Sequence, residues 1–307
     1  MQISYDYYRV FYHVAKYHSF TRAAEVLLSN QPNVTRAVKN LESALGCILF
    51  VRSNRGVQLT DEGECLYAHI RLAFEHIQRG EEELAFSKSL GSGIVSIGAS
   101  ETALHCLLLP VLKQYKAAHP GVSIKVSNHS TPQAIAALKN GIVDIAVVTT
   151  PLDSSEILKT VPVKMFREAA VCGSSFSALA DREVSFAELA EYPIVCLGAE
   201  TKTHEFYAKL FAEHGLTLRT DIEAATADQI LPMVKNDLGI GFVPEEFVRS
   251  EKDQQSFFVL NLAEEIPPRY ICIVKRTDTS LSPAAKELER MLLLSRDVDR
   301  NTQETNH

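Results

Sequence analysis

The stretch that most constrains this chain runs from Ser19 to Thr60, because its spacing predicts two short helices, a tight turn and a basic hairpin. The first helix is expected from roughly Thr21 to Leu28, with Ser19 placed to cap it. Its apolar face includes small residues that permit close helix packing, and consists of Ala23, Ala24, Leu27 and Leu28. Helix, short turn and helix together predict a helix-turn-helix.

The second helix of this stretch has the clearer periodicity. Asn30 can cap its start, and Pro32 is tolerated in the first turn, where its missing N–H matters least. A core-facing stripe is predicted at Val34, Val38, Leu41 and Leu45. The opposite face carries amide, hydroxyl and cationic groups and no acid before Glu42, which suits a DNA major groove.

After the helices, the β-rich runs ILFVR and GVQLT are joined by residues that favour a hairpin. Two arginines would make the tip of this hairpin cationic. The candidate DNA-contacting residues of the whole head are Thr21, Gln31, Pro32, Asn33, Thr35, Arg36, Lys39, Arg52 and Arg55.

Charge separates a DNA-binding head from an ordinary structural module, which the same two helices could also form. Residues 1–60 carry seven basic and three acidic residues, a balance of +4 in a chain of net charge −7. A locally basic head on an acidic protein is expected if phosphate contacts supply affinity there and not elsewhere.

The same residues resemble the heads of LysR-type bacterial transcriptional regulators. The shared segments follow in order as SFTRAA (19–24), NQPNVTR (30–36), LESALG (41–46), LFVR (49–52) and LTDEG (59–63). Two departures from the family pattern are Asn30, where Ser is usual, and Asn33, where a small residue is common. Because Asn can read adenine edges bidentately, the operator preference can differ from the family norm.

The resemblance implies an α+β multidomain protein. It consists of a winged helix-turn-helix at 1–59, a linker and dimerisation helix at 60–90, and an effector-binding domain at 91–307 similar to periplasmic binding proteins. The implied partners are a double-stranded DNA operator, a small-molecule effector, a second copy of the chain in a homodimer or homotetramer, and RNA polymerase.

Composition sets broad limits on the rest of the chain. A length of 307 residues suits two or three domains, and 46% hydrophobic residues can fill their cores. Neither a signal-peptide h-region nor a run of roughly 18 apolar residues is present, so the bacterial cytoplasm is expected and no membrane partner is. The six cysteines lack C-x-x-C spacing, which favours buried reduced thiols over a metal site or disulfide framework.

A long helix is predicted to follow the hairpin, from Thr60 as its cap to about Leu90. Its expected apolar face is Leu66, Ile70, Ala73, Ile77 and Leu84. A helix of about thirty residues extends roughly 45 Å, more than the small head can cover. A partner helix is therefore the natural cover, with packing inside its own chain as the alternative.

From Ile94 onward the pattern alternates between strands and helices. VSIGA, VSIKVS and DIAVVTT, with helices between them, predict a βαβαβ unit, and a similar alternation restarts at AAVCG. Two α/β lobes are implied, lobe one at about 91–161 with 267–295 and lobe two at about 162–266. RYICIVKR and the helix from Pro283 to Leu294 are expected to return to lobe one, and the tail DVDRNTQETNH is expected to be disordered.

Ligand is expected in the cleft between these lobes, near strand carboxyl ends and helix N-termini, where N–H and hydroxyl groups favour small anions. The candidate effector-binding residues are Ser100, Thr102, Ser130, Thr131, Thr149, Thr201, Thr203 and Thr226. Hydroxyls at Ser100, Thr102 and Thr149 match positions that anion-binding members of the family use. Each hydroxyl alone could equally be a helix cap.

The predicted function is an effector-controlled, sequence-specific DNA-binding regulator. An enzyme is not expected, because the chain contains no G-x-S-x-G, Walker A, H-E-x-x-H or dinucleotide motif, and no cofactor is predicted. The alternative is an effector-independent architectural or nucleoid protein, which would not need a two-lobed domain of about two hundred residues.

Overall fold

The computed structural model describes residues 3–53, 56–86, 93–251 and 256–304. The chain divides into two compact units, Met1–Ala85 and Phe86–His307, and each is described by itself. Within the described ranges, every helix is too short or too polar to cross a bilayer.

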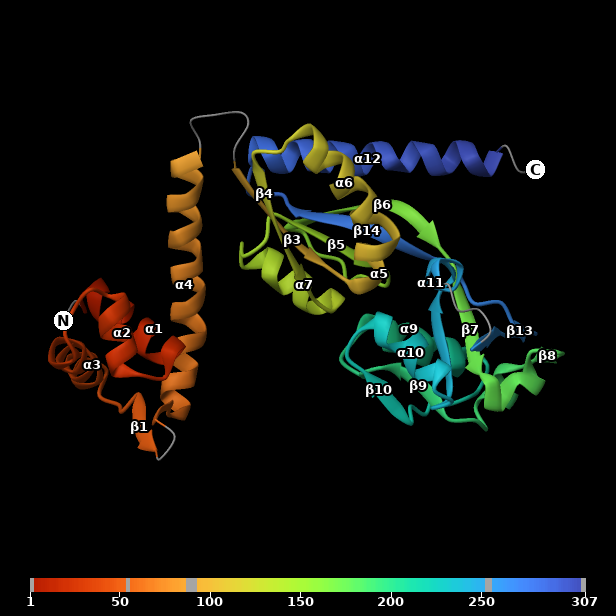
Figure 1. Cartoon of the computed structure of the whole chain (residues 1–307), viewed down its shortest axis with the longest axis horizontal. Coiled ribbons are helices and arrows are strands. Elements are labelled where there is room, and N and C mark those ends of the chain that lie inside the picture. Colours follow the sequence, from red (N-terminus) through yellow and green to blue (C-terminus); the bar gives the residue numbers. More distant parts are fainter. Residues whose placement is uncertain (1–2, 54–55, 87–92, 252–255, 305–307) are drawn as a thin grey trace. The chain divides into compact units, whose positions relative to one another are not determined.

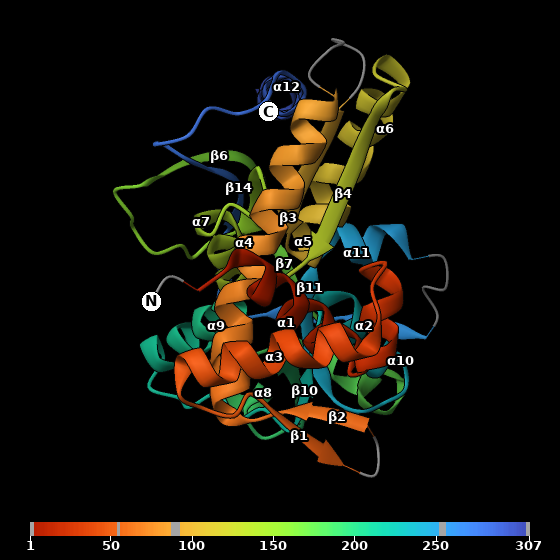
Figure 2. The same cartoon turned by 90° about the vertical axis from the view of Figure 1, so that its left-hand side faces the viewer.

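The first unit is built from three short helices and a hairpin. Figure 2 shows α1 (Tyr5–Tyr17), α2 (Phe20–Val26) and α3 (Gln31–Leu45) above the antiparallel pair β1 (Phe50–Ser53) and β2 (Gly56–Leu59). The apolar spacing of the sequence places its core residues on facing sides of the helices, at Phe11, Val14, Ala23, Ala24, Val34, Val38 and Leu41. The predicted helix-turn-helix and hairpin are confirmed.

The predicted caps of this unit are also present. The Ser19 hydroxyl accepts a hydrogen bond from Arg22 N, and Asn30 Oδ1 accepts one from Asn33 N at 2.9 Å. The predicted core faces were wrong at one position each. Leu28 is 96% exposed, because α2 ends at Val26 and Leu28 takes a left-handed turn conformation. Leu45 is exposed, because it lies in the last turn of α3, beyond the reach of α1.

The long helix α4 (Asp61–Phe86) follows the hairpin, as predicted, and Figure 1 shows it alongside the three short helices of its unit. Its first turn is capped by the Thr60 hydroxyl, which accepts from Gly63 N at 3.0 Å. Gly63 has no room for a side chain, since a Cβ there would lie 2.2 Å from Leu49 O. The helix is therefore anchored at its start by the LTDEG segment.

The contacts of α4 differ in part from the predicted apolar face. Leu66, Tyr67 and Ile70 pack against the head, and Phe74 is buried in a stack on Tyr12 with ring centroids 4.7 Å apart. Ala73 and Ile77, predicted on that face, are exposed in the chain alone. The side chain of Leu84 is not among those described, and the predicted end of the helix near Leu90 lies outside the described residues.

Lobe one of the second unit is a five-stranded sheet of order β4-β3-β5-β14-β6. Its strands are β3 (Gly93–Ala99), β4 (Val122–Asn128), β5 (Ile145–Thr149), β6 (Leu158–Phe166) and β14 (Arg269–Arg276). Its helices are α5 (Glu101–Ala103), a π-helical turn at Leu104–Leu108, α6 (Leu109–Ala118), α7 (Thr131–Lys139) and α12 (Pro283–Glu304). The predicted return of the C-terminal strand and helix to this lobe is confirmed.

Lobe two is a second sheet of order β10-β9-β11-β7-β12 with a two-stranded β13-β8 pair beside it. Its strands are β7 (Glu168–Gly173), β8 (Glu183–Val184), β9 (Ile194–Leu197), β10 (Ile222–Ala224), β11 (Ile240–Pro244), β12 (Phe257–Val259) and β13 (Asn261–Leu262). Its helices are α8 (Phe186–Leu189), α9 (Lys202–Glu213), α10 (Ile230–Lys235) and α11 (Glu245–Ser250), with 3-10 turns at Ser174–Leu179 and Ala227–Gln229.

Two expectations for this unit are corrected. β6 stays paired with β14 as far as Phe166, so the sheet of lobe one extends past the predicted limit of residue 161. Pro162 obscured this strand in the sequence, and it is tolerated because β6 is an edge strand. The tail predicted to be disordered instead continues α12 through Glu304, since its charged residues and absence of Gly and Pro keep the helix uninterrupted.

Candidate functional site

The first candidate site is the outward face of α3 in the head. Gln31, Pro32, Asn33, Arg36 and Lys39 are exposed there, as predicted, while Thr35 is half-buried. Thr21, predicted as a further contact, is exposed on α2. The side chain of Arg52 is not among those described, and Arg55 lies outside the described residues, so their roles stay predictions.

The charges around α3 favour a polyanion. The Arg36 guanidinium donates to Asn33 Oδ1 at 3.3 Å, which aligns an amide and a cation on the exposed face. Glu42, the first acid on the helix, turns inward and accepts from Leu49 N at 2.8 Å. A cationic helix face without a competing carboxylate can contact phosphates and base edges.

The second candidate site is a pocket between the two lobes of the second unit. All eight predicted hydroxyl residues line it. Ser100, Thr102, Thr131, Thr149 and Thr201 are buried. The strand ends and helix starts that the sequence placed at this cleft therefore come together.

Several of these hydroxyls also serve as helix caps. Ser100 Oγ accepts from Ala103 N at 3.4 Å at the start of α5. Thr201 Oγ1 accepts from His204 N at 3.1 Å and donates to Gly198 O at 2.8 Å. Thr201 is thus fully engaged by its own chain, whereas Ser100 keeps its proton available. Ser100 can therefore cap α5 through its oxygen and still donate its hydroxyl proton to a ligand.

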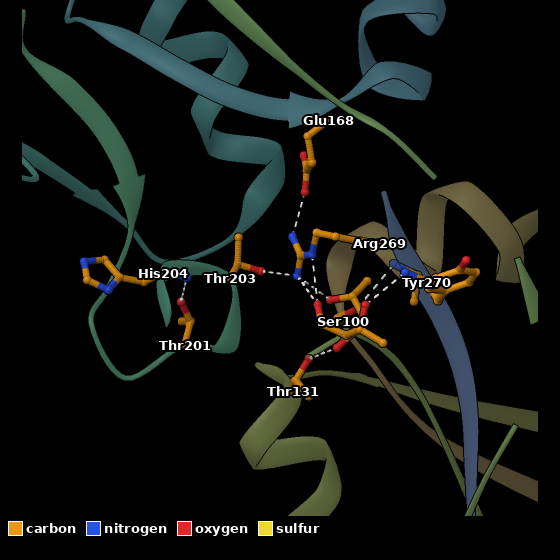
Figure 3. A network of polar contacts seen from close by, with 11 residues as sticks. Ser100, Thr131, Glu168, Thr201, Thr203, His204, Arg269 and Tyr270 are labelled. Carbon is orange, nitrogen blue, oxygen red and sulfur yellow. Dashed lines mark hydrogen bonds and ion pairs between the residues drawn. The ribbon is translucent and has the colours of Figure 1, made fainter. Parts of the chain in front are cut away.

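Sequence reasoning missed the buried cation behind this pocket, Arg269. Its side chain is 2% exposed, and its Nη1 donates to Glu168 Oε1 at 2.6 Å. Nε and Nη2 donate to Thr150 O at 2.9 and 2.7 Å. Nη2 also donates to two pocket hydroxyls, Thr149 Oγ1 at 3.2 Å and Thr203 Oγ1 at 3.0 Å. In Figure 3 the Arg269 guanidinium points toward Glu168 on one side and toward Thr203 on another.

The surroundings of this ion pair are apolar. The guanidinium lies 4.9 Å from the ring centre of Phe206 and 5.4 Å from that of Phe166. Burial raises the pKa of the Glu168 carboxyl, an effect that the Arg269 charge opposes. The one available sequence signal was that Glu168 and Arg269 each directly precede an apolar run, AAVCG and YICIV.

Other pocket residues that were not predicted carry charge or hydrogen-bonding groups. Glu101 lines the pocket but accepts from Asn128 and, at 2.8 Å, from the His105 ring. Lys202, at the start of α9, reaches Asp153 of lobe one at 2.8 Å. This pair links the two lobes at the rim. The further lining residues are His129, Leu197, Ala225 and Ala227.

The four buried cysteines contribute little nucleophilic character. Four of the six are buried, and burial raises the pKa of Cys106 and Cys196 to about 12 and that of Cys172 and Cys272 to about 11. A thiol with such a pKa carries almost no thiolate near neutral pH. Cys47 is half-buried and Cys65 is exposed.

Comparison with known proteins gives matches to both the N-terminal head and the C-terminal two-lobed domain. The profile of the bacterial regulatory helix-turn-helix protein of the lysR family matches residues 5–64, and that of the LysR substrate binding domain matches residues 88–294. The RuBisCO operon transcriptional regulator of Allochromatium vinosum is 26% identical over 296 residues, covering 95% of this chain and 96% of that protein. The HTH-type transcriptional regulator YofA of Bacillus velezensis is 28% identical over 282 residues, covering 91% and 94%.

Among solved structures, full-length CbnR complexed with its target DNA has a TM-score of 0.75 at 17% identity, covering 96% of this chain and all of that one. These matches define an effector-responsive DNA-binding regulator, whose relatives are transcriptional regulators and not enzymes. The chain belongs to the LysR family of transcriptional regulators. The expected regulator is thereby confirmed over the architectural alternative, because the effector-binding domain is present.

Proposed function

We propose that this regulator responds to a small anion or carboxylate bound in the pocket between its two lobes. The observation that carries the proposal is the convergence of eight hydroxyl residues from both lobes on one pocket. Hydroxyl and N–H donors at helix starts stabilise a negatively charged ligand even where no cationic side chain contacts it. The Ser100, Thr149 and Thr203 hydroxyls would contact the ligand directly.

We further propose that the working division of the chain is a head at 1–59, a linker helix at 60–90 and an effector domain at 91–307. The exposed Ile77 and Ala73 of α4 suit a second copy of the same helix, which would pair two heads on a partly palindromic operator. Two such dimers would form a tetramer that contacts RNA polymerase in the bacterial cytoplasm. Ligand would shift the population between two arrangements of this assembly.

The α3 face would supply the operator contacts. Gln31, Asn33 and Arg36 would read base edges, and Lys39 with the hairpin arginines would contact phosphates. Paired heads would bind far more tightly than one, because the second contact becomes intramolecular.

The pocket proposal is tested by thermal unfolding of the full chain with small anions at constant ionic strength. We expect at least one of sulfate, phosphate and acetate to raise the unfolding midpoint of the unsubstituted chain further as its concentration increases. The double variant Ser100→Ala with Thr149→Ala should lose that rise. A midpoint that no anion raises, or that rises equally in the double variant, contradicts the proposal.

A further inference from the structure

The Arg269 side chain is almost completely buried, and its hydrogen bonds go to protein groups. Nη1 donates to Glu168 and Nε to the Thr150 carbonyl, while the two N–H groups of Nη2 are shared among that carbonyl and the hydroxyls of Thr149 and Thr203. The rings of Phe166 and Phe206 lie beside the guanidinium. A buried charge is costly unless it is paired and hydrogen-bonded, and here both conditions are met. Its contacts nevertheless extend beyond what pairing with Glu168 requires.

Those contacts fix the direction of two hydroxyl protons. A guanidinium can only donate, so each threonine oxygen accepts from Arg269 and must point its own proton elsewhere. Among the described residues, neither the Thr149 nor the Thr203 hydroxyl donates to a protein group. Both side chains line the pocket, which leaves it as the direction for their O–H groups.

The neighbouring positive charge also strengthens these donors. A hydroxyl that accepts from a cation is polarised, and it donates more strongly in a low-dielectric site. Ser100 adds a third donor, because its oxygen accepts from Ala103 N. A ligand rich in acceptor lone pairs is favoured at this position, and a ligand that must itself donate is disfavoured.

The same guanidinium spans the two lobes. Thr149 ends β5 of lobe one and Thr150 follows it directly. Thr203 lies in the first turn of α9 of lobe two, and Glu168 begins β7 where the chain crosses between lobes. An anion held by Thr149 and Thr203 would add a second link across the same gap. Ligand recognition and lobe closure therefore share one buried side chain.

We propose that Arg269 is the positioning residue that makes this pocket selective for anions, by turning the Thr149 and Thr203 hydroxyls into oriented donors that join the lobes. The inference rests on the proposed anion pocket and assigns its selectivity to a residue that does not itself line the pocket.

The test measures anion affinity by isothermal titration of the full chain with sulfate, phosphate and acetate. In Arg269→Lys the ion pair with Glu168 can persist, but a single ammonium cannot reproduce the planar fork that reaches both hydroxyls. We expect affinity to fall on the order of tenfold or more. In Glu168→Gln the hydroxyl contacts of Arg269 remain, so we expect affinity to be kept or increased.

Two further variants separate positioning from stability. Leu189→Ala, in the buried core of lobe two and away from the pocket, should lower the unfolding midpoint while leaving anion affinity unchanged. Arg269→Met with Glu168→Leu removes both charges together, which buried pairs often tolerate, and should fold but lose the anion.

These measurements distinguish the role of Arg269 from the existence of the anion pocket. Unchanged affinity in Arg269→Lys or in the charge-free double variant overturns the role of Arg269 while leaving the pocket intact. Equal losses in Arg269→Lys and Glu168→Gln also overturn it, because they indicate a structural ion pair only. A failure of the unsubstituted chain to bind any of the three anions contradicts the pocket itself, and with it the selectivity assigned to Arg269.

Discussion

In the proposed DNA-binding face, single residues on α3 would determine which contacts the head makes with DNA. Arg36 is exposed and held beside Asn33, so its guanidinium is positioned before any duplex arrives. Lys39 lies one turn further along the same helix. The inward turn of Glu42 matters equally, because an outward carboxylate there would repel phosphate.

We expect Arg36→Ala to weaken binding to a selected operator by about 1–3 kcal/mol, the usual worth of one specific arginine contact. The measurement is a gel-shift titration at several salt concentrations. Arg9→Ala is the matched control, since Arg9 is a half-exposed arginine of the same head on α1. Equal losses in the two variants would show that net charge alone, and not the α3 face, binds DNA.

His13 gives the head a pH dependence. Its pKa is lowered by burial, and then by the charges of Lys16 and Arg9, so the folded head binds fewer protons than the unfolded chain. The free energy of unfolding is therefore unaffected by His13 above the ordinary histidine pKa of about 6.5. It decreases as pH falls from there through the lower pKa of His13 in the folded head.

We expect His13→Gln to lose less stability than the unsubstituted chain between pH 7 and pH 5. Denaturant unfolding monitored by near-ultraviolet circular dichroism at several pH values makes the comparison. Parallel losses in both chains would mean that other groups account for the acid sensitivity.

Among the elements, α4 has two kinds of apolar side chain with different expected partners. Phe74 is buried against Tyr12 and Tyr5 of its own head, with the Tyr5 ring centre 5.4 Å away, whereas Ile77 is 40% exposed one turn later. The first contact should stabilise the monomer, and the second is available to another copy.

We expect Phe74→Ala to cost about 3–5 kcal/mol of head stability, as for other buried aromatic truncations. Ile77→Ala should change monomer stability by about 0.5 kcal/mol or less but weaken self-association in sedimentation equilibrium. The pairing proposed for α4 fails if Ile77→Ala leaves the association constant unchanged.

Elements with strong local signals could be predicted from the sequence. The caps at Ser19, Asn30 and Thr60 and the apolar period of α3 specify much of the head without knowledge of its neighbours. β6 was missed because Pro162 reads as a strand breaker, and only the sheet reveals that the strand lies at an edge. Leu28 was misjudged because the end of α2 depends on a turn conformation that helical periodicity does not encode.

Across the whole molecule, the sequence located residues that lie at strand ends and helix starts around one pocket, but it missed residues that meet only through the fold. The eight hydroxyls lie at strand ends and helix starts, so topology alone brought them to one cleft. Arg269 and Glu168 are about one hundred residues apart, and their pairing depends on two crossings between the lobes. Sequence spacing carries no signal for such a contact.

The two proposed activities, operator binding and anion binding, belong to separate units of one chain. Binding of an anion in the pocket is proposed to affect binding of the head to DNA. We propose operator binding at the α3 face and anion binding at the hydroxyls that contact Arg269. If the link is real, occupancy of the pocket must change a property measured on DNA.

The most direct test is the affinity and footprint of the full chain on an operator selected from a random duplex pool, with and without the stabilising anion at fixed ionic strength. We expect the anion to change the affinity or the footprint of the unsubstituted chain. The Ser100→Ala with Thr149→Ala variant should bind the same duplex equally well in both conditions. An unsubstituted chain that ignores the anion, or a double variant that responds to it just as strongly, would contradict the account.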